Sequence, residues 1–134
     1  MTSRGLEILS EEECLSLLRS RSLGRVAVQI GDVPSILPVN YALLDNDIVF
    51  RTDPGSKLLA SLMKVLFAFE VDDADFRTRS GWSVLVVGYS EQVRDRATLV
   101  RVDELGLKPW VTEGRDFVVR IRTRTMTGRR IPAR

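Results

Sequence analysis

The sequence contains no histidine and only one cysteine, Cys14. The absence of histidine removes the usual ligand of zinc and iron sites and the commonest general base in catalysis. It also excludes hydrolases built on a Ser-His or Cys-His pair, and a single cysteine excludes an internal disulfide. We therefore expect no metal centre and no hydrolytic triad, and the residues alone assign no catalytic side chain.

Long hydrophobic runs are absent as well. None approaches the roughly 20 residues that a membrane-spanning helix needs, and the first residues contain no hydrophobic signal core. The chain has 134 residues, of which 44% are hydrophobic and 28% charged, which is typical of one ordinary soluble domain. We expect a single domain over residues 1–134 that is cytoplasmic and not bound to a membrane.

Charge is distributed unevenly along the chain. The net charge is +2, but residues 115–134 carry seven arginines and one acid, Asp116, so the remainder of the chain is acidic. Clustered arginines could bind nucleic-acid phosphates, yet this segment has a single aromatic residue, Phe117, which is predicted to point inward. We favour instead a stripe that meets the acidic residues 72–75, in this chain or in a partner subunit, or that faces water.

The pattern of apolar residues predicts mostly strands. They are expected over residues 24–30, 36–44, 48–52, 65–71, 84–93 and 117–124, with an acidic loop at 72–75. Helices are expected over 11–19, where Ser10 and Glu13 form a capping box, and over 56–64 and 96–105. Because no βαβ alternation dominates, we expect a closed or partly closed antiparallel barrel with helices at its rim.

Two prolines interrupt the predicted strand 36–44 and the turn before it. Pro34 and Pro38 cannot donate to a ladder, so part of this segment must lie at an edge, at a bulge or beside something other than a strand, such as a ligand. Asn40 is disfavoured in a strand unless its amide has a partner, which a heterocycle or a cross-strand hydrogen bond could provide. Trp82 could equally be a core residue or the wall of a ligand site.

The segment that follows the strand 48–52 predicts an anion site. A short turn, residues 53–55, leads to Ser56 and Lys57 at the start of a helix, and Arg51 and Thr52 immediately precede it. A lysine in the first helical turn opposes the helix dipole unless an anion binds there. Lys57 is either a solvated surface residue or, with Arg51 beside it, a phosphate ligand, and we favour the phosphate.

Five segments in this order and spacing resemble one family. They are Gly24–Ala27, Pro38–Tyr41, Ile48–Thr52 with Gly55–Lys57, Gly81–Val84, and Thr127–Ile131. The sequence resembles the pyridoxamine 5'-phosphate oxidase-like superfamily of FMN-binding split β-barrels, and in particular its short actinobacterial-type members. The resemblance implies a mainly β fold, an antiparallel split β-barrel of Greek-key type with three short peripheral helices.

The resemblance also implies a cofactor, a set of residues that bind it and a partner. FMN would be the cofactor, and the family forms homodimers with two flavins at the subunit interface. The residues that would line the isoalloxazine and ribityl chain are Pro38, Val39, Asn40 and Tyr41. Those that would hold the phosphate are Arg51, Thr52, Ser56 and Lys57. Ser83, with Trp82 beside it, would make a polar contact to the flavin.

The activity implied is that of an FMN-dependent oxidoreductase, which transfers a hydride or electrons through the flavin to an unidentified small molecule. The alternatives are a deazaflavin-dependent reductase on the same fold and a flavin-binding or storage module without turnover. The chain lacks the C-terminal arginine-histidine motif and the tryptophan of true pyridoxamine 5'-phosphate oxidases, so the resemblance does not extend to that activity. Related short members often have a histidine where this chain has Phe117.

Overall fold

The computed structural model describes residues 5–52, 62–107 and 117–133, and this part of the chain is mainly β. The elements are β1 Glu7–Ile8, α1 Glu11–Arg19, β2 Leu23–Ile30, β3 Val33–Leu44, β4 Asp47–Thr52, β5 Leu66–Asp75, β6 Ser80–Gln92, α3 Arg96–Glu104 and β7 Phe117–Ile131. Neither helix in these ranges has the length and apolarity needed to span a bilayer.

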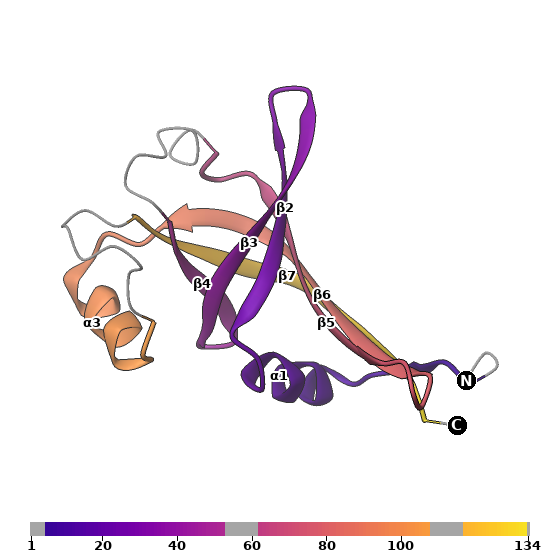
Figure 1. The fold of residues 1–134 in the computed structure, drawn as a ribbon. Helices are drawn as coiled ribbons and strands as arrows, with labels where there is room; N and C mark the ends of the chain where they lie inside the picture. Colours follow the sequence, from indigo (N-terminus) through magenta and orange to yellow (C-terminus); the bar gives the residue numbers. More distant parts are fainter. Residues whose placement is uncertain (1–4, 53–61, 108–116, 134) are drawn as a thin grey trace.

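Six strands form a closed antiparallel barrel. Their order is β7-β4-β3-β2-β5-β6, and β6 pairs back with β7 to close the ring, while the short β1 pairs with the far end of β7 (Figure 1). The predicted antiparallel barrel with peripheral helices is confirmed. The helix expected over residues 56–64 falls largely outside the described residues, so the described part contains two helices at the barrel's rim.

Local sequence signals define several element ends. The turn between β3 and β4 places Asp45 at φ 49° and Asn46 at φ 68°, which matches the two-residue hairpin turn that suits the twist of the strands. Ser10 and Glu13 form the predicted capping box of α1, with bonds of 3.0 and 3.2 Å. Gly88 lies at a register shift in β6, where an added Cβ would stand 2.0 Å from the carbonyl oxygen of Arg122.

The prediction of an acidic loop at residues 72–75 was wrong. These residues continue β5, and they pair with β6 from Asp72 opposite Ser83 to Asp75 opposite Ser80. The long strand β6 supplies backbone partners on this side, so ladder pairing overrides the low strand propensity of aspartate. The sheet β5-β6-β7 therefore extends beyond the barrel as a three-stranded ribbon, seen at the lower right of Figure 1.

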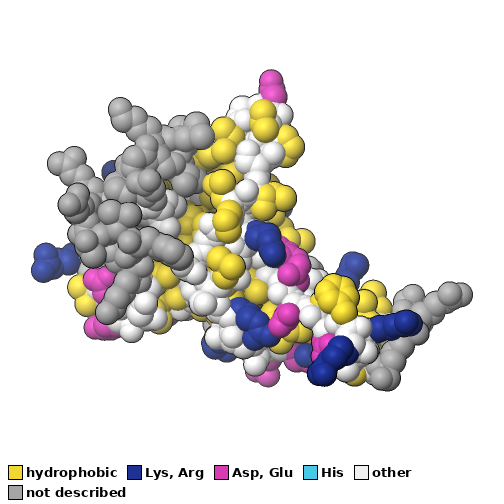
Figure 2. All heavy atoms as spheres, viewed as in Figure 1, with side chains coloured by type: hydrophobic (Ala, Val, Ile, Leu, Met, Phe, Trp, Pro, Cys, Tyr) yellow, Lys and Arg dark blue, Asp and Glu magenta, His cyan; other side chains and the backbone are white. Residues whose placement is uncertain are grey.

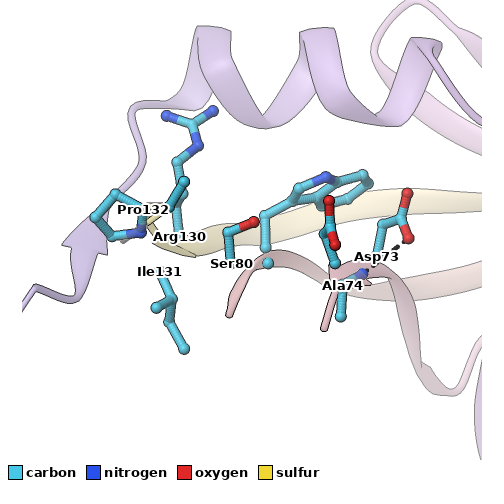
Figure 3. A pocket seen from close by; sticks show the side chains of 10 residues that line it. Asp73, Ala74, Ser80, Arg130, Ile131 and Pro132 are labelled. Atoms are coloured by element: carbon cyan, nitrogen blue, oxygen red, sulfur yellow. Dashed lines mark hydrogen bonds between the residues drawn. The ribbon is translucent and has the colours of Figure 1, made fainter. Parts of the chain in front are cut away.

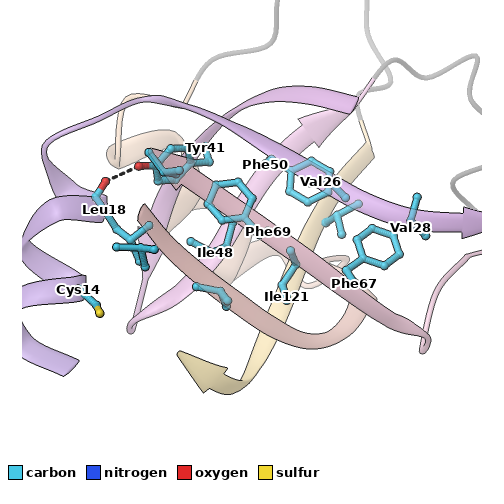
Figure 4. Packing of buried hydrophobic residues seen from close by; sticks show 14 of the residues in the cluster. Cys14, Leu18, Val26, Val28, Tyr41, Ile48, Phe50, Phe67, Phe69 and Ile121 are labelled. Carbon is cyan, nitrogen blue, oxygen red and sulfur yellow. Dashed lines mark hydrogen bonds between the residues drawn. The ribbon is translucent and has the colours of Figure 1, made fainter. Parts of the chain in front are cut away.

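The core fills the barrel (Figure 4). Its largest fully buried side chains are aromatic and β-branched, and include Phe50, Phe67 and Phe69. The Tyr41 ring meets Phe69 edge to face at 4.8 Å, and its hydroxyl donates to the Leu18 carbonyl at 2.5 Å. Burial raises the pKa of Tyr41 to about 12. The side chain of Tyr41 thus ties α1 to the barrel.

A second, smaller apolar cluster lies under α3. It contains Val49, Val102, Leu107 and Val118 among its buried residues. Val118 stands opposite Arg51 on the outer side of the barrel and is buried there because α3 covers it.

The arginine stripe is also less exposed than the alternation of β7 predicts. Arg120 is only 7% exposed and pairs with Asp47 at 2.9 Å. Arg122 is exposed and pairs with Glu91 at 2.8 Å. Among the described residues, these two arginines therefore pair with acids of β4 and β6. The acids at 72 and 73 pair instead with Arg25 and Arg21, as described below.

Candidate functional site

The predicted flavin-lining residues of β3 lie on two sides of the barrel wall. Side chains alternate along a strand, so Val39 and Tyr41 point toward the core while Pro38 and Asn40 point outward. Tyr41 is 4% exposed, so a ligand on the outside could meet only its backbone. The side chains of Pro38 and Asn40 remain the candidates for ligand contact on this strand.

Arg51 lies next to Asn40 on the outer side of the barrel. The β3–β4 register pairs Tyr41 with Phe50, and one step further places Asn40 opposite Arg51. The Arg51 side chain is only 9% exposed; its Nε donates to the Leu107 carbonyl at 2.7 Å, and its Nη2 pairs with Asp103. The guanidinium of Arg51 is therefore held against α3.

The other predicted phosphate ligands are placed only in part. Thr52 points to the opposite side of β4 from Arg51, and its hydroxyl donates to the Phe117 carbonyl at 3.3 Å. Ser56 and Lys57 lie outside the described residues. Convergence of all four residues on one phosphate stays a prediction.

Asp103 and the Leu107 carbonyl are partners of Arg51 that sequence reasoning missed. The helix α3 begins at an N-cap, Asp95, whose carboxylate accepts from the Thr98 amide at 3.0 Å. It ends before Gly106, whose φ of 80° suits glycine and turns the chain so that Leu107 packs into the apolar cluster. No sequence signal could have linked Asp103 to a residue 52 positions earlier.

Trp82 and Ser83 lie on the ribbon, away from the Arg51 region. Trp82 stands opposite Arg130 in the ladder, and the Arg21 guanidinium lies 5.4 Å from the centre of its ring. Arg21 also pairs with Asp73 at 2.6 Å, which holds the pKa of Asp73 below its ordinary value.

Two adjoining pockets, of about 310 and 580 Å³, open on this ribbon, and Trp82 lines both. Figure 3 shows the smaller one, with the Arg130 side chain directed toward α1. Arg130 meets Glu13 there at 3.3 Å. Ser83 lines the larger pocket, together with Arg129 and Asp72.

The two groups of predicted residues lie on different strands of one chain. Along β7 they are twelve residues apart, because Arg51 pairs with Val118 and Trp82 pairs with Arg130. Across the sheet they are nearer, because Asn40 stands opposite Leu23 of β2 and Ser83 stands opposite Asp72 of β5. With β2 and β5 adjacent and neighbouring strands about 4.8 Å apart, Asn40 and Ser83 are separated by three strand spacings, roughly 15 Å.

An apolar row crosses the outer surface of the barrel. Ile36, Ala27, Ala68 and Val87 are directly opposite one another on four consecutive strands, and Ile36 is 68% exposed. Further exposed apolar residues on the same strands are Leu23, Leu66, Leu85 and Tyr89. Figure 2 shows hydrophobic side chains gathered on the projecting β2–β3 hairpin. We call this set the outer apolar surface.

A charged cluster lies within the outer apolar surface. Arg25 of β2 meets Glu70 at 3.4 Å and Asp72 at 3.5 Å, both of them on β5. Partial burial, together with the hydrogen bond and the charge of neighbouring Asp72, raises the pKa of Glu70 to about 7. The spacing of Glu70 and Asp72, two residues apart, would have indicated this pair if β5 had been predicted to full length. Among the described residues, no group of three or more potential metal ligands lies together.

Comparisons with known proteins identify the family. The family model described as pyridoxamine 5'-phosphate oxidase matches residues 10–130. An uncharacterized protein of Mycobacterium tuberculosis, Rv0080, is 36% identical over 137 residues, which cover 98% of this chain and 90% of the relative.

Two solved structures are similar over almost their entire length. The FAD binding protein from Mycobacterium smegmatis has a TM-score of 0.84 and 36% identity, covering 93% of this chain and 98% of that one. A conserved protein of unknown function from Corynebacterium diphtheriae has a TM-score of 0.80 and 35% identity, with coverages of 96% and 99%. With the family match over residues 10–130, these likenesses show that the chain belongs to the pyridoxamine 5'-phosphate oxidase family.

Proposed function

We propose that the protein is a homodimeric flavoprotein that binds FMN on the outer surface of the barrel beside Arg51. The observation that carries the proposal is the placement of Asn40 and Arg51 side by side on that surface, next to Pro38. The name of the similar Mycobacterium smegmatis protein, which states FAD binding, supports a flavin as the ligand class.

The residues fit the chemistry of a flavin nucleotide. A guanidinium is the side chain best suited to phosphate, because its planar fork can donate two parallel hydrogen bonds. The Asn40 amide offers a donor and an acceptor to a heterocycle whose edge alternates acceptors and donors. Exposed apolar side chains such as Leu23, which pairs with Asn40, offer a surface against which a planar ring can lie.

In this proposal the chain's own residues bind and orient the cofactor. Arg51, with Ser56 and Lys57, would hold the phosphate, and Thr52 would contribute only its backbone. The side chains of Pro38 and Asn40 would lie along the ring and the ribityl chain, and Val39 and Tyr41 would contribute only backbone atoms. Bound flavin supplies the capacity to accept and donate a hydride or electrons. The protein contributes position, exclusion of water and positive charge for the transfer to a small molecule.

One observation supports a second copy of the chain as the partner. The outer apolar surface spans four strands, and it includes Leu23, which stands opposite Asn40. Contact with a second chain would cover this surface, and a flavin beside Asn40 would then lie at the edge of the contact. We therefore propose that each flavin is shared between two subunits.

The experiment that tests flavin binding is the absorption spectrum of the purified protein, followed by titration of flavin-free protein with FMN, FAD and a deazaflavin. We expect FMN to bind with micromolar or better affinity. Tight binding of the deazaflavin alone would favour a deazaflavin-dependent reductase. Binding of FMN without oxidation of reduced nicotinamide, across a panel of acceptors, would favour a storage module. No binding of any of the three would overturn the proposal.

A further inference from the structure

We infer that Asp103 is a positioning residue for the phosphate of the bound flavin, and that it acts through Arg51. The inference rests on the proposed function, because it concerns the residue proposed to hold that phosphate. The observation behind it is that α3 and the residues just after it, a segment with no predicted role in the site, contact the Arg51 guanidinium through Asp103 and the Leu107 carbonyl.

The two contacts fix the orientation of the guanidinium. Nε donates to the Leu107 carbonyl at 2.7 Å, and Nη2 donates to the Asp103 carboxylate. In an arginine these two nitrogens share one edge of the planar group, so two acceptors along that edge fix both the plane and its rotation. An arginine that is held in this way loses less side-chain freedom when an anion binds, which favours affinity.

The acceptors themselves are rigidly placed. Val102 on the inner side of α3 is fully buried, and Leu107 is 7% exposed in the same apolar cluster, so the end of the helix cannot shift freely. Gly106, with its φ of 80°, turns the chain between them. Two hydrogen-bond acceptors for Arg51, the Leu107 carbonyl and the Asp103 carboxylate, are therefore held in fixed positions on the outer side of β4.

The ion pair with Arg51 explains why an acid stands in the last turn of α3. An acid in the last turn of a helix is disfavoured by the helix dipole. The Asp103 side chain is 68% exposed, so the fold does not require its burial, and it pairs with Arg51, whose side chain is 9% exposed. A carboxylate beside a phosphate site also lowers the local positive charge. Its presence there is explained if orienting Arg51 contributes more to binding than the lost positive charge costs.

The test is isothermal titration of Asp103→Ala with FMN and with riboflavin, which lacks the phosphate. One hydrogen bond to a charged group contributes enough for about a ten-fold change, part of which the Leu107 carbonyl retains. We expect Asp103→Ala to weaken FMN binding roughly five-fold and to leave riboflavin binding unchanged. Asp103→Asn, which keeps an acceptor oxygen, should restore most of the affinity.

Two controls separate positioning from other effects. Glu104→Gln removes an acid from the same helical turn, has no described contact with Arg51, and should leave both affinities unchanged. In an Arg51→Ala background, Asp103→Ala should have no further effect, because Asp103 acts through Arg51.

Tighter FMN binding by Asp103→Ala would overturn the inference and make Asp103 a competing anion. Equal losses for FMN and riboflavin would also overturn it and assign Asp103 a purely structural role. Unchanged FMN affinity in a wild-type protein that binds FMN would refute this inference alone, whereas no FMN binding by the wild type would refute the proposed function as well.

Discussion

Arg120 and Arg122 lie two positions apart on β7 and should differ sharply in their contribution to stability. The Arg120 side chain is 9% exposed, and both its Nε and its Nη2 lie 2.9 Å from one oxygen of Asp47, whose side chain is 14% exposed. The Arg122 side chain is 54% exposed and pairs with Glu91 at the surface. Substituting each arginine in turn therefore compares the loss of a buried ion pair with the loss of a solvated one.

The magnitude follows from the burial of the partner that remains. Removing one member of a buried pair costs about 3–5 kcal/mol, because the other charge is left in a poorly solvated site. Asp47 would keep its bond from the Thr123 amide at 3.0 Å, so we place Arg120→Ala at the low end, about 3 kcal/mol. Arg122→Ala loses the surface pair with Glu91 and a longer contact of 3.6 Å to Asp47, both made by a guanidinium that is 54% exposed, and should cost about 1 kcal/mol.

Urea denaturation at one fixed protein concentration measures both costs. A double-mutant cycle with Asp47→Ala should give a coupling energy to Arg120 of about 2 kcal/mol, since the pair is desolvated. Equal costs for the two arginines, or a coupling energy near zero, would refute the claim that burial decides the difference.

Two further predictions concern single groups in the barrel wall. Tyr41→Phe removes the buried hydrogen bond to the Leu18 carbonyl and should lower the free energy of unfolding by about 1 kcal/mol, while a flavin titration should show unchanged affinity, because the ring is in the core. A large loss of flavin affinity would place the hydroxyl in the site instead. Glu70 has a pKa raised to about 7, so the folded state disfavours its ionised form, and stability should fall as the pH rises from about 4.5 through 7. Glu70→Gln should flatten that dependence in melting curves taken across this range, and an identical pH profile in the variant would contradict the assignment.

The strands of the barrel were predictable because their signals are local. Short runs of β-branched and apolar residues identified β2 and β4, alternation identified the inner side of β7, and the Asp45-Asn46 turn specified the β3–β4 hairpin. The extension of β5 through Asp72 to Asp75 was not predictable from composition, because its cause is pairing with β6. The burial of Arg120 was missed for the same reason, since its partner Asp47 comes from a distant strand.

The residues of the candidate site could be predicted from the sequence, but the directions and contacts of their side chains could not. The sequence predicted that all residues of Pro38–Tyr41 line the flavin. Strand geometry instead directs the Tyr41 side chain into the core and the Asn40 side chain outward. Arg51 was identified by its place before a helix start, but the contacts that orient it come from Asp103 of α3 and from the Leu107 carbonyl just after that helix. These relations depend on packing between elements far apart in sequence, which no local pattern records.

The most direct test of a flavin shared between subunits is a mixed dimer. One chain would carry Arg51→Ala, the other Trp82→Ala with Ser83→Ala, and two different affinity tags would isolate the mixed species after co-expression. If each flavin takes Arg51 from one chain and the Trp82-Ser83 pair from the other, the mixed dimer contains one intact site and one doubly altered site. It should then bind one FMN per dimer with wild-type affinity, while both parent homodimers bind at least ten-fold more weakly. A mixed dimer with no site of wild-type affinity would contradict the shared site and place each flavin within a single chain.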